Sequence, residues 1–193
     1  RWSASVSANV RAGCSRTPRD AAATCTTNTG SATGAKSISQ TPPANFDDAT
    51  LADLWGQVRA LHHAGIPHEE LHAGNIALDV DGRVWLLGLE NGEIAADQLT
   101  LRIDDGELLV TTALIVGADR AVRGALQELT AQRLGEALPL LQTIALSRTN
   151  RKAIKKDREV LQDLRDAVVS AFPAAPTEPV RLERTRPRMV FAF

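Results

Sequence analysis

The chain has 193 residues, a net charge of −1 and a hydrophobic content of 44%. This length suits one globular domain with a sizeable core, and the near-neutral charge argues against a nucleic-acid-binding protein with a strongly basic surface. No run of roughly eighteen apolar residues occurs, so the sequence predicts no transmembrane helix within this stretch.

Residues 1–46 have a composition unlike that of the rest of the chain. Before residue 46 they contain no Leu and a single acidic residue, Asp20, and they are rich in Ser, Thr and Ala. Such a segment buries too little apolar surface to offset its ordering entropy, so we expect a disordered low-complexity tail. A transit peptide or a wrongly assigned translation start would have the same composition.

Two short patterns in this tail suggest binding sites that their context does not support. Gly30–Ser37 resembles a phosphate-binding loop, but Ala35 replaces its second Gly and no apolar strand precedes it. Cys14 and Cys25 do not have a usual zinc-ligand spacing, and two cysteines imply no disulfide framework. We therefore predict neither a nucleotide site nor a metal site there.

Globular patterns begin near residue 47. Candidate N-caps at Asp47, Asp48 and Thr50 precede apolar residues at helical spacing up to Leu61, and Gly65 is a stop signal. Residues 76–80 and 83–87, joined by Asp81–Gly82, predict a β-hairpin. The pattern from 104 to 172 is helical, and Pro173 ends it.

The most informative segment is His68-Glu69-Glu70-Leu71-His72-Ala73-Gly74-Asn75-Ile76. It resembles the H-G-D-L-H-x-G-N-I catalytic loop of aminoglycoside and choline phosphotransferases, which are distant relatives of protein kinases. The resemblance places Glu70 where the family has its catalytic Asp. It gives Asn75 the role of holding a metal ion on the nucleotide phosphates.

The segments that follow appear in the order of the same family. The apolar strand 84–87 leads into Gly88-Leu89-Glu90, at the position of the family's D-F-G or D-F-E triplet. The segment from Ile103 to Leu109 resembles the start of the family's next helix, whose Asp, here Asp104, braces the catalytic loop. The resemblance also implies that His68 is structural and packs under the triplet.

Three departures from the family pattern argue against ordinary ATP-dependent catalysis. Glu70 moves the carboxylate by about 1 Å, and such a misplacement costs roughly 100-fold. Gly88 removes the metal-binding carboxylate of the triplet, and no G-x-G-x-x-G loop or V-A-I-K strand precedes residue 68. We therefore predict no cofactor, with Mg²⁺ and ATP bound through Asn75 and Glu90 only if residual kinase activity persists.

Two further groups of residues have competing interpretations. The four histidines, His62, His63, His68 and His72, resemble a zinc cluster, but Gly65, Pro67 and Gly74 indicate a loop, and we predict no zinc site. The basic run at 151–156 is a solvated helix face or a contact for anionic lipid headgroups.

The tail at 174–193 carries four closely spaced arginines ahead of the apolar stretch Met189–Phe193. This pattern is typical of a juxtamembrane segment that contacts a membrane domain or an anionic lipid surface, although a frayed basic terminus would look the same. The stretch 50–188 also resembles the soluble kinase-like region of actinobacterial membrane proteins of the lysylphosphatidylglycerol synthetase/flippase-like type. The resemblance implies a location on the cytoplasmic face of a membrane, or in the cytoplasm if the chain exists at this length.

Together these observations predict a mainly α (α+β) fold. Residues 47–173 would form the C-lobe of a protein-kinase-like fold with one small β-hairpin, and the N-lobe would be missing. The predicted function is a degenerate phosphotransferase-like (pseudokinase) module that scaffolds or regulates a membrane protein and is not expected to be an enzyme in its own right. A working small-molecule phosphotransferase whose N-lobe lies outside this chain, and a non-functional gene fragment, remain as alternatives.

Overall fold

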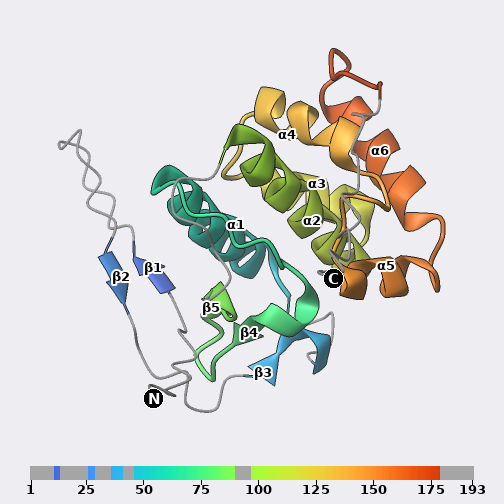
Figure 1. Ribbon diagram of the computed structural model, residues 1–193. Helices are drawn as coiled ribbons and strands as arrows, with labels where there is room; N and C mark the ends of the chain where they lie inside the picture. Colours follow the sequence, from blue (N-terminus) through green and yellow to red (C-terminus); the bar gives the residue numbers. More distant parts are fainter. Residues whose placement is uncertain (1–10, 14–25, 29–35, 41–45, 90–96, 179–193) are drawn as a thin grey trace, which may run out of the picture.

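A computed structural model of the chain describes residues 11–13, 26–28, 36–40, 46–89 and 97–178. The described part is mainly helical and has one small three-stranded antiparallel sheet, which confirms the coarse fold prediction (Figure 1). A separate antiparallel pair joins β1 (Arg11–Gly13) to β2 (Thr26–Asn28).

The first helix, α1 (Asp48–His63), forms as the sequence predicts. The Asp47 side chain is its N-cap and accepts a hydrogen bond from the Thr50 backbone N–H at 2.8 Å. Its apolar residues at helical spacing, Leu51, Leu54 and Leu61 among them, are buried in the core. This helix leads directly into the motif segment.

The sheet has the strand order β3-β4-β5. Strands β4 (Ile76–Leu78) and β5 (Val84–Leu86) form the predicted hairpin, although both are shorter than expected. Gly82 adopts a φ of +75°, which explains why a glycine stands in the turn. The third strand, β3 (Lys36–Ser37), pairs with β4 and was not predicted.

The segment around β3 packs against the globular unit, although the sequence analysis placed it in the disordered tail. The short 3₁₀ helix η1 (Ile38–Gln40) follows β3 directly. Ile38 is 2% exposed and Phe46 is 1% exposed, so both belong to the core. Burial of these two apolar side chains stabilises a segment whose overall composition is polar.

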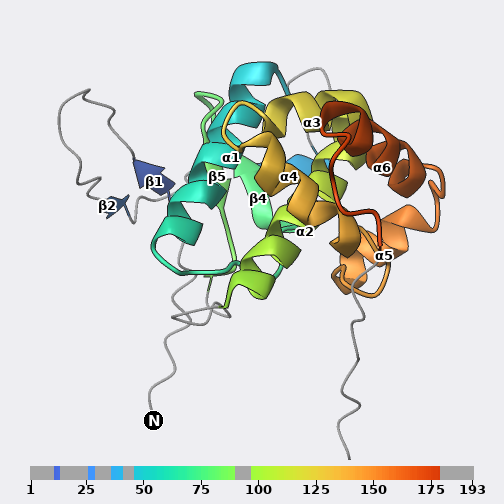
Figure 2. The same cartoon turned by 90° about the horizontal axis from the view of Figure 1, so that it is seen from above.

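The helical part from 97 onwards consists of several helices arranged around α2 (Gln98–Val116). This helix begins ahead of the predicted position because Asp97 caps it, accepting from the Thr100 backbone N–H at 2.8 Å. Figure 2 shows the neighbouring helices gathered beside it. They are α3 (Ala118–Ala125), α4 (Ala131–Ala137), η5 (Leu138–Leu140), α5 (Arg148–Ile154) and α6 (Val160–Ala171), and α2 contacts each of them.

In the part of the chain that the structure describes, no helix combines the length and the hydropathy needed to cross a membrane. Cys14, Cys25 and the arginine-rich tail up to Phe193 lie outside the described residues, as does most of Gly30–Ser37.

Candidate functional site

The motif segment runs from the end of α1 to the sheet, and its backbone is anchored first by Asp104 on α2. One carboxylate oxygen of Asp104 accepts from the His68 backbone N–H at 2.6 Å, and the other accepts from the Glu69 backbone N–H at 2.8 Å. Asp104 is 1% exposed, so these charge-assisted hydrogen bonds lie away from water. The expected contact between Asp104 and the loop is therefore present.

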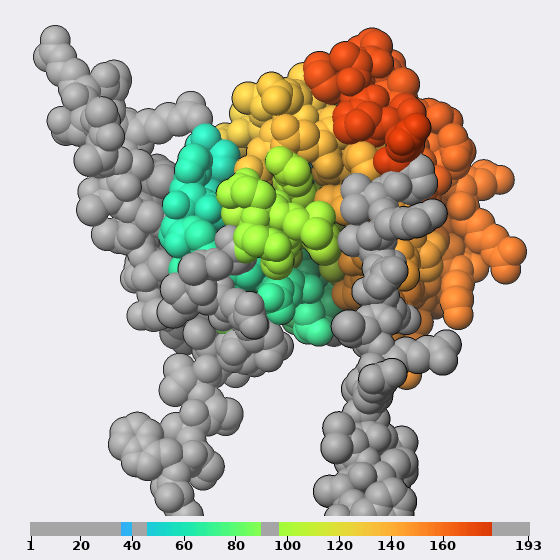
Figure 3. All heavy atoms as spheres, turned by 45° about the horizontal axis from the view of Figure 1, so that its top comes forward, coloured from blue at the N-terminus to red at the C-terminus, as the bar shows by residue number. Residues whose placement is uncertain are grey.

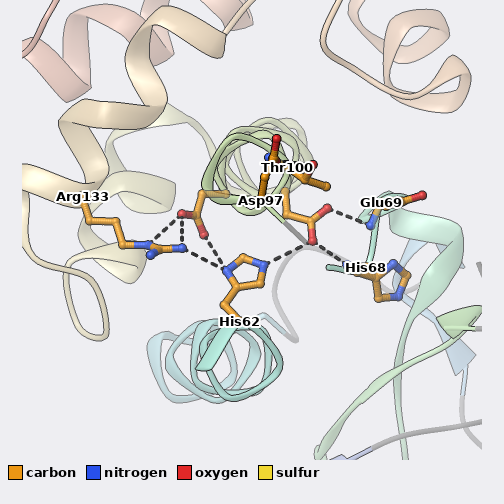
Figure 4. A network of polar contacts seen from close by, with 8 residues as sticks. His62, His68, Glu69, Asp97, Thr100 and Arg133 are labelled. Atoms are coloured by element: carbon orange, nitrogen blue, oxygen red, sulfur yellow. Dashed lines mark hydrogen bonds and ion pairs between the residues drawn. The ribbon is translucent and has the colours of Figure 1, made fainter. Parts of the chain in front are cut away.

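His62 on α1 connects Asp104 to a second buried acid, Asp105 (Figure 4). Its Nε2 lies 3.2 Å from Asp104 Oδ2, and its Nδ1 lies 3.4 Å from Asp105 Oδ1. Burial alone would lower the pKa of His62, but its hydrogen bonds to Asp104 and Asp105 outweigh this effect and raise the pKa. Arg133 on α4 completes the group, with its guanidinium 2.9 Å from Asp105 Oδ2.

A second anchor ties the loop to α2 and α5 through a buried chain of hydrogen bonds. The Thr111 hydroxyl donates to the Leu71 carbonyl at 2.6 Å and accepts from Asn150 Nδ2 at 2.8 Å. The same amide nitrogen of Asn150 donates to Glu107 Oε1 at 3.1 Å. Glu107 is 1% exposed, and burial raises its pKa to about 7.

The sheet supplies the remaining backbone contacts of the loop. The Ser37 hydroxyl on β3 donates to the Ala73 carbonyl at 2.8 Å, and the Leu87 backbone N–H donates to the Asn75 carbonyl at 2.8 Å. The loop ends in the 3₁₀ turn η3 (Ala73–Asn75), which His72 caps by accepting from the Gly74 N–H. Three elements outside the loop, namely α2, β3 and the strand end after β5, therefore fix its path.

Glu69 has a φ of +67° and is the only residue other than glycine with a positive φ in the part of the chain described. The phosphotransferase motif has Gly at this position, where a left-handed backbone carries no steric penalty. A residue with a Cβ costs roughly 1 kcal/mol more in this conformation. The loop backbone thus holds a non-glycine residue in a strained conformation.

Asn75 lies close to both Glu70 and Gly88, the two other positions that the resemblance singles out. The Asn75 Nδ2 donates to the Glu70 carbonyl at 3.1 Å, while the Glu70 side chain is exposed. Gly88 has a φ of +81°, and a Cβ built on it would lie 3.1 Å from Asn75 Nδ2 and 3.5 Å from Asn75 Oδ1. A side chain at position 88 would therefore point at the Asn75 amide.

The part of this donor set that the structure describes falls short of what Mg²⁺ requires. Mg²⁺ takes oxygen ligands in a near-octahedral arrangement, usually with one or two carboxylates. Asn75 offers one amide oxygen and Gly88 offers none, while Glu90 lies outside the described residues. Among the residues with a described placement, no group of three or more His, Cys, Asp or Glu side chains is arranged to hold a metal.

His68 packs in the core beneath the loop. Its side chain is fully buried, and neither ring nitrogen has a hydrogen-bond partner in the described structure. Burial lowers the pKa of His68, which the charge of Asp104 opposes only in part. A neutral imidazole therefore fills this space, as a structural residue would.

Sequence reasoning identified Asp104, Glu70 and Asn75 but missed several residues that hold the loop. His62 was considered only as a zinc candidate, and Ser37 only as part of a phosphate-loop pattern. Thr111 and Asn150 belong to no motif, and Glu107 lies in the segment 103–109 but has no role assigned by the resemblance. Helical periodicity places Thr111 on the buried side of an apolar helix. A buried polar side chain needs a hydrogen-bond partner, so this position could have been singled out from the sequence.

Comparison of this chain with protein-family models, with curated proteins and with solved structures gives no match.

Proposed function

We propose that residues 46–178 contain a degenerate phosphotransferase-like (pseudokinase) module of the kinase C-lobe type. Its loop 68–75 would serve as architecture, without transferring phosphate. The single observation that carries this proposal is the position of Gly88 against the Asn75 amide. In this proposal position 88 would share a metal ion with Asn75. Gly88 has no side chain there, although a side chain at this position would meet the Asn75 amide.

The arrangement of the loop supports the same proposal. The buried Asp104 binds two consecutive backbone N–H groups of the loop, and Thr111 binds the carbonyl two residues further on. These contacts fix the backbone at considerable desolvation cost, yet the side chains at positions 70 and 88 lack the geometry and the ligand for catalysis. Such a combination favours a scaffolding role over turnover.

The partner in this proposal is a membrane protein, attached to or associated with the module. It is supported by the sequence of the tail at 174–193, in which four arginines precede the apolar stretch Met189–Phe193. The module would then sit on the cytoplasmic face of the membrane and regulate or position the neighbouring domain.

One observation favours a second candidate, a phosphotransferase whose N-lobe is supplied from outside this chain. The Glu70 carboxylate is exposed on the loop and remains accessible to a substrate hydroxyl. In this alternative Glu70 would act as the catalytic base, with a side chain one methylene longer than that of Asp. Asn75 beside it would hold the metal ion.

ATP turnover by the purified full chain in the presence of Mg²⁺ tests the proposal. We expect no conversion of ATP to ADP above that of buffer, because no carboxylate stands at position 88. The Asn75→Ala variant is the matched control, since it removes the remaining metal-ligand candidate. Turnover that depends on Asn75 would contradict the proposal and favour the second candidate.

A further inference from the structure

Helix α5 and the turn after it present a concentration of positive charge. Residues 148–158 contain six basic side chains and one acidic side chain, in a chain whose net charge is −1. We call these six residues the α5 basic face: Arg148, Arg151, Lys152, Lys155, Lys156 and Arg158. All are exposed except Arg151, which is half-buried.

Three of the basic side chains share one side of the helix and its C-cap. Successive residues of an α-helix are rotated by about 100° around its axis. Viewed down this axis, Arg148, Lys152 and Lys155 therefore lie within roughly 40° of the direction of Arg148. Asn150 and Ile154 lie opposite and are 2% and 7% exposed. Figure 3 shows orange segments, which include α5, at the rim of the molecule, and five of the six basic side chains are exposed there.

The α5 basic face has no ion-pair partner in the described part of the chain. None of its six residues forms an ion pair with another described residue, whereas Arg59, Arg120 and Arg133 each pair with an acid. Asp157 is the only acid inside the segment. Like charges so close together repel one another, and an external anionic surface would relieve that repulsion.

The helix that carries the face is firmly attached to the core. The Asn150 amide donates to both Glu107 and Thr111, at 3.1 and 2.8 Å. The Ser147 side chain caps the helix by accepting from the Asn150 backbone N–H. The basic side chains are therefore presented from a fixed base, which reduces the ordering cost of binding.

We propose that the α5 basic face docks on a membrane surface that contains anionic lipids. Residues 143–159 contain no aromatic side chain, so they offer no platform for stacking nucleic-acid bases. Helix α5 has only seven residues and its inner side is buried. It therefore does not project from the body as a recognition helix that enters the DNA major groove does. A membrane requires only several Lys and Arg side chains on one side of the body.

Ile144 adds an apolar element just before the helix. Its side chain is 40% exposed, and it stands four residues before Arg148 in the chain. An exposed apolar side chain next to cations favours the headgroup boundary of a bilayer over the phosphates of a nucleic acid. This inference does not rest on the proposed function, because no residue of 68–90 takes part in it.

Co-sedimentation of the full chain with lipid vesicles tests the proposal. We expect the chain to bind phosphatidylcholine vesicles that contain about one quarter phosphatidylserine, and binding to weaken strongly as salt rises from roughly 0.1 M to 0.5 M. The variant Lys152→Gln/Lys155→Gln/Lys156→Gln should lower the partition coefficient on the order of 100-fold.

The matched control removes three basic residues from other elements: Arg83→Gln/Arg102→Gln/Arg123→Gln. It should bind nearly as well as the wild-type chain, since none of its sites lies on α5. The arginines of the C-terminal tail are present in both variants, so the difference between them reports on α5 alone. The far-ultraviolet circular dichroism of both variants should match that of the wild type.

Three outcomes would overturn the proposal. One is equal binding of the two triple variants, and another is equal binding to vesicles with and without phosphatidylserine. The third is salt-sensitive binding to double-stranded DNA that the lysine variant loses, without binding to vesicles, because it would identify the partner as a nucleic acid.

Discussion

Glu69 is the residue at which backbone strain is most clearly localised. It holds a φ of +67°, while its neighbour Glu70 is not among the residues with a positive φ. Glu69→Gly should raise the free energy of unfolding by up to about 1 kcal/mol, because relief of a strain of roughly 1–2 kcal/mol outweighs the freedom that glycine adds to the unfolded chain.

The matched control for this substitution is Glu70→Gly. It should lower the free energy of unfolding by about 0.5–1 kcal/mol, because it adds backbone freedom to the unfolded chain without relieving strain. Urea denaturation of the two variants measures both effects. The same sign of change in both would show that Glu69 is not strained.

Glu107 predicts a pH dependence of stability. Its pKa is raised from 4.5 to about 7 in the folded chain, chiefly by burial. Between these values the folded state keeps a proton that the unfolded state has lost. The contribution of Glu107 to the free energy of unfolding therefore falls as pH rises from about 4.5 to 7, by on the order of 3 kcal/mol.

Comparison of the wild-type chain with Glu107→Gln isolates this effect. The variant should show a flatter dependence of stability on pH across this window, measured by urea denaturation at several pH values. The raised pKa of His62 and the lowered pKa of His68 act in both proteins, so they cancel in the difference. Parallel pH profiles would mean that Glu107 titrates normally.

Among the secondary-structure elements, β3 and η1 are the ones whose role is least evident from sequence. Ile38, just after β3, is 2% exposed and belongs to the main core. Ile38→Ala should therefore lower the free energy of unfolding by about 2–4 kcal/mol, which is typical of a cavity left in a core. Calorimetric or denaturant unfolding of the full chain measures the change.

Val80→Ala is the matched control, because Val80 lies in the hairpin turn and is 84% exposed. It should change stability by less than about 0.5 kcal/mol. If Ile38→Ala were equally mild, residues 36–40 would not pack on the sheet as described.

The elements that periodicity predicts well are α1 and the β4–β5 hairpin. Apolar residues recur at the right interval in α1, and Asp81–Gly82 marks the turn. The start of α2 was predicted late because Leu101 alone marks the buried side of its first turn, and the Asp97 cap was not considered. Strand β3 was missed because two residues define no period, and only tertiary pairing with β4 creates it.

At the scale of the whole molecule, α2 connects the candidate site to the rest of the fold. Asp104, Glu107 and Thr111 stand at i, i+3 and i+7 on this helix, so they face the same side. The first and last of these bind the loop, and the middle one reaches α5 through Asn150. The loop, the centre of the fold and the basic helix thus form one continuous set of hydrogen bonds.

The sequence located this site only in part. Motif resemblance identified Asp104 and its contact with the loop, because a residue type at a fixed position of a motif can be recognised from the sequence alone. The supports from Ser37, His62 and Asn150 lie 36, 42 and 39 residues from their partners. Contacts over such separations depend on how the helices pack, which a single sequence does not specify.

The central claim is that the loop 68–75 persists as architecture and no longer holds a nucleotide. It is tested most directly by thermal unfolding of the full chain with ATP, with and without Mg²⁺ or Mn²⁺. We predict a cooperative transition whose midpoint moves by no more than about 1 °C in any of these conditions, because a ligand that does not bind the folded state does not stabilise it. A rise of several degrees that requires the metal and disappears in Asn75→Ala would contradict the account.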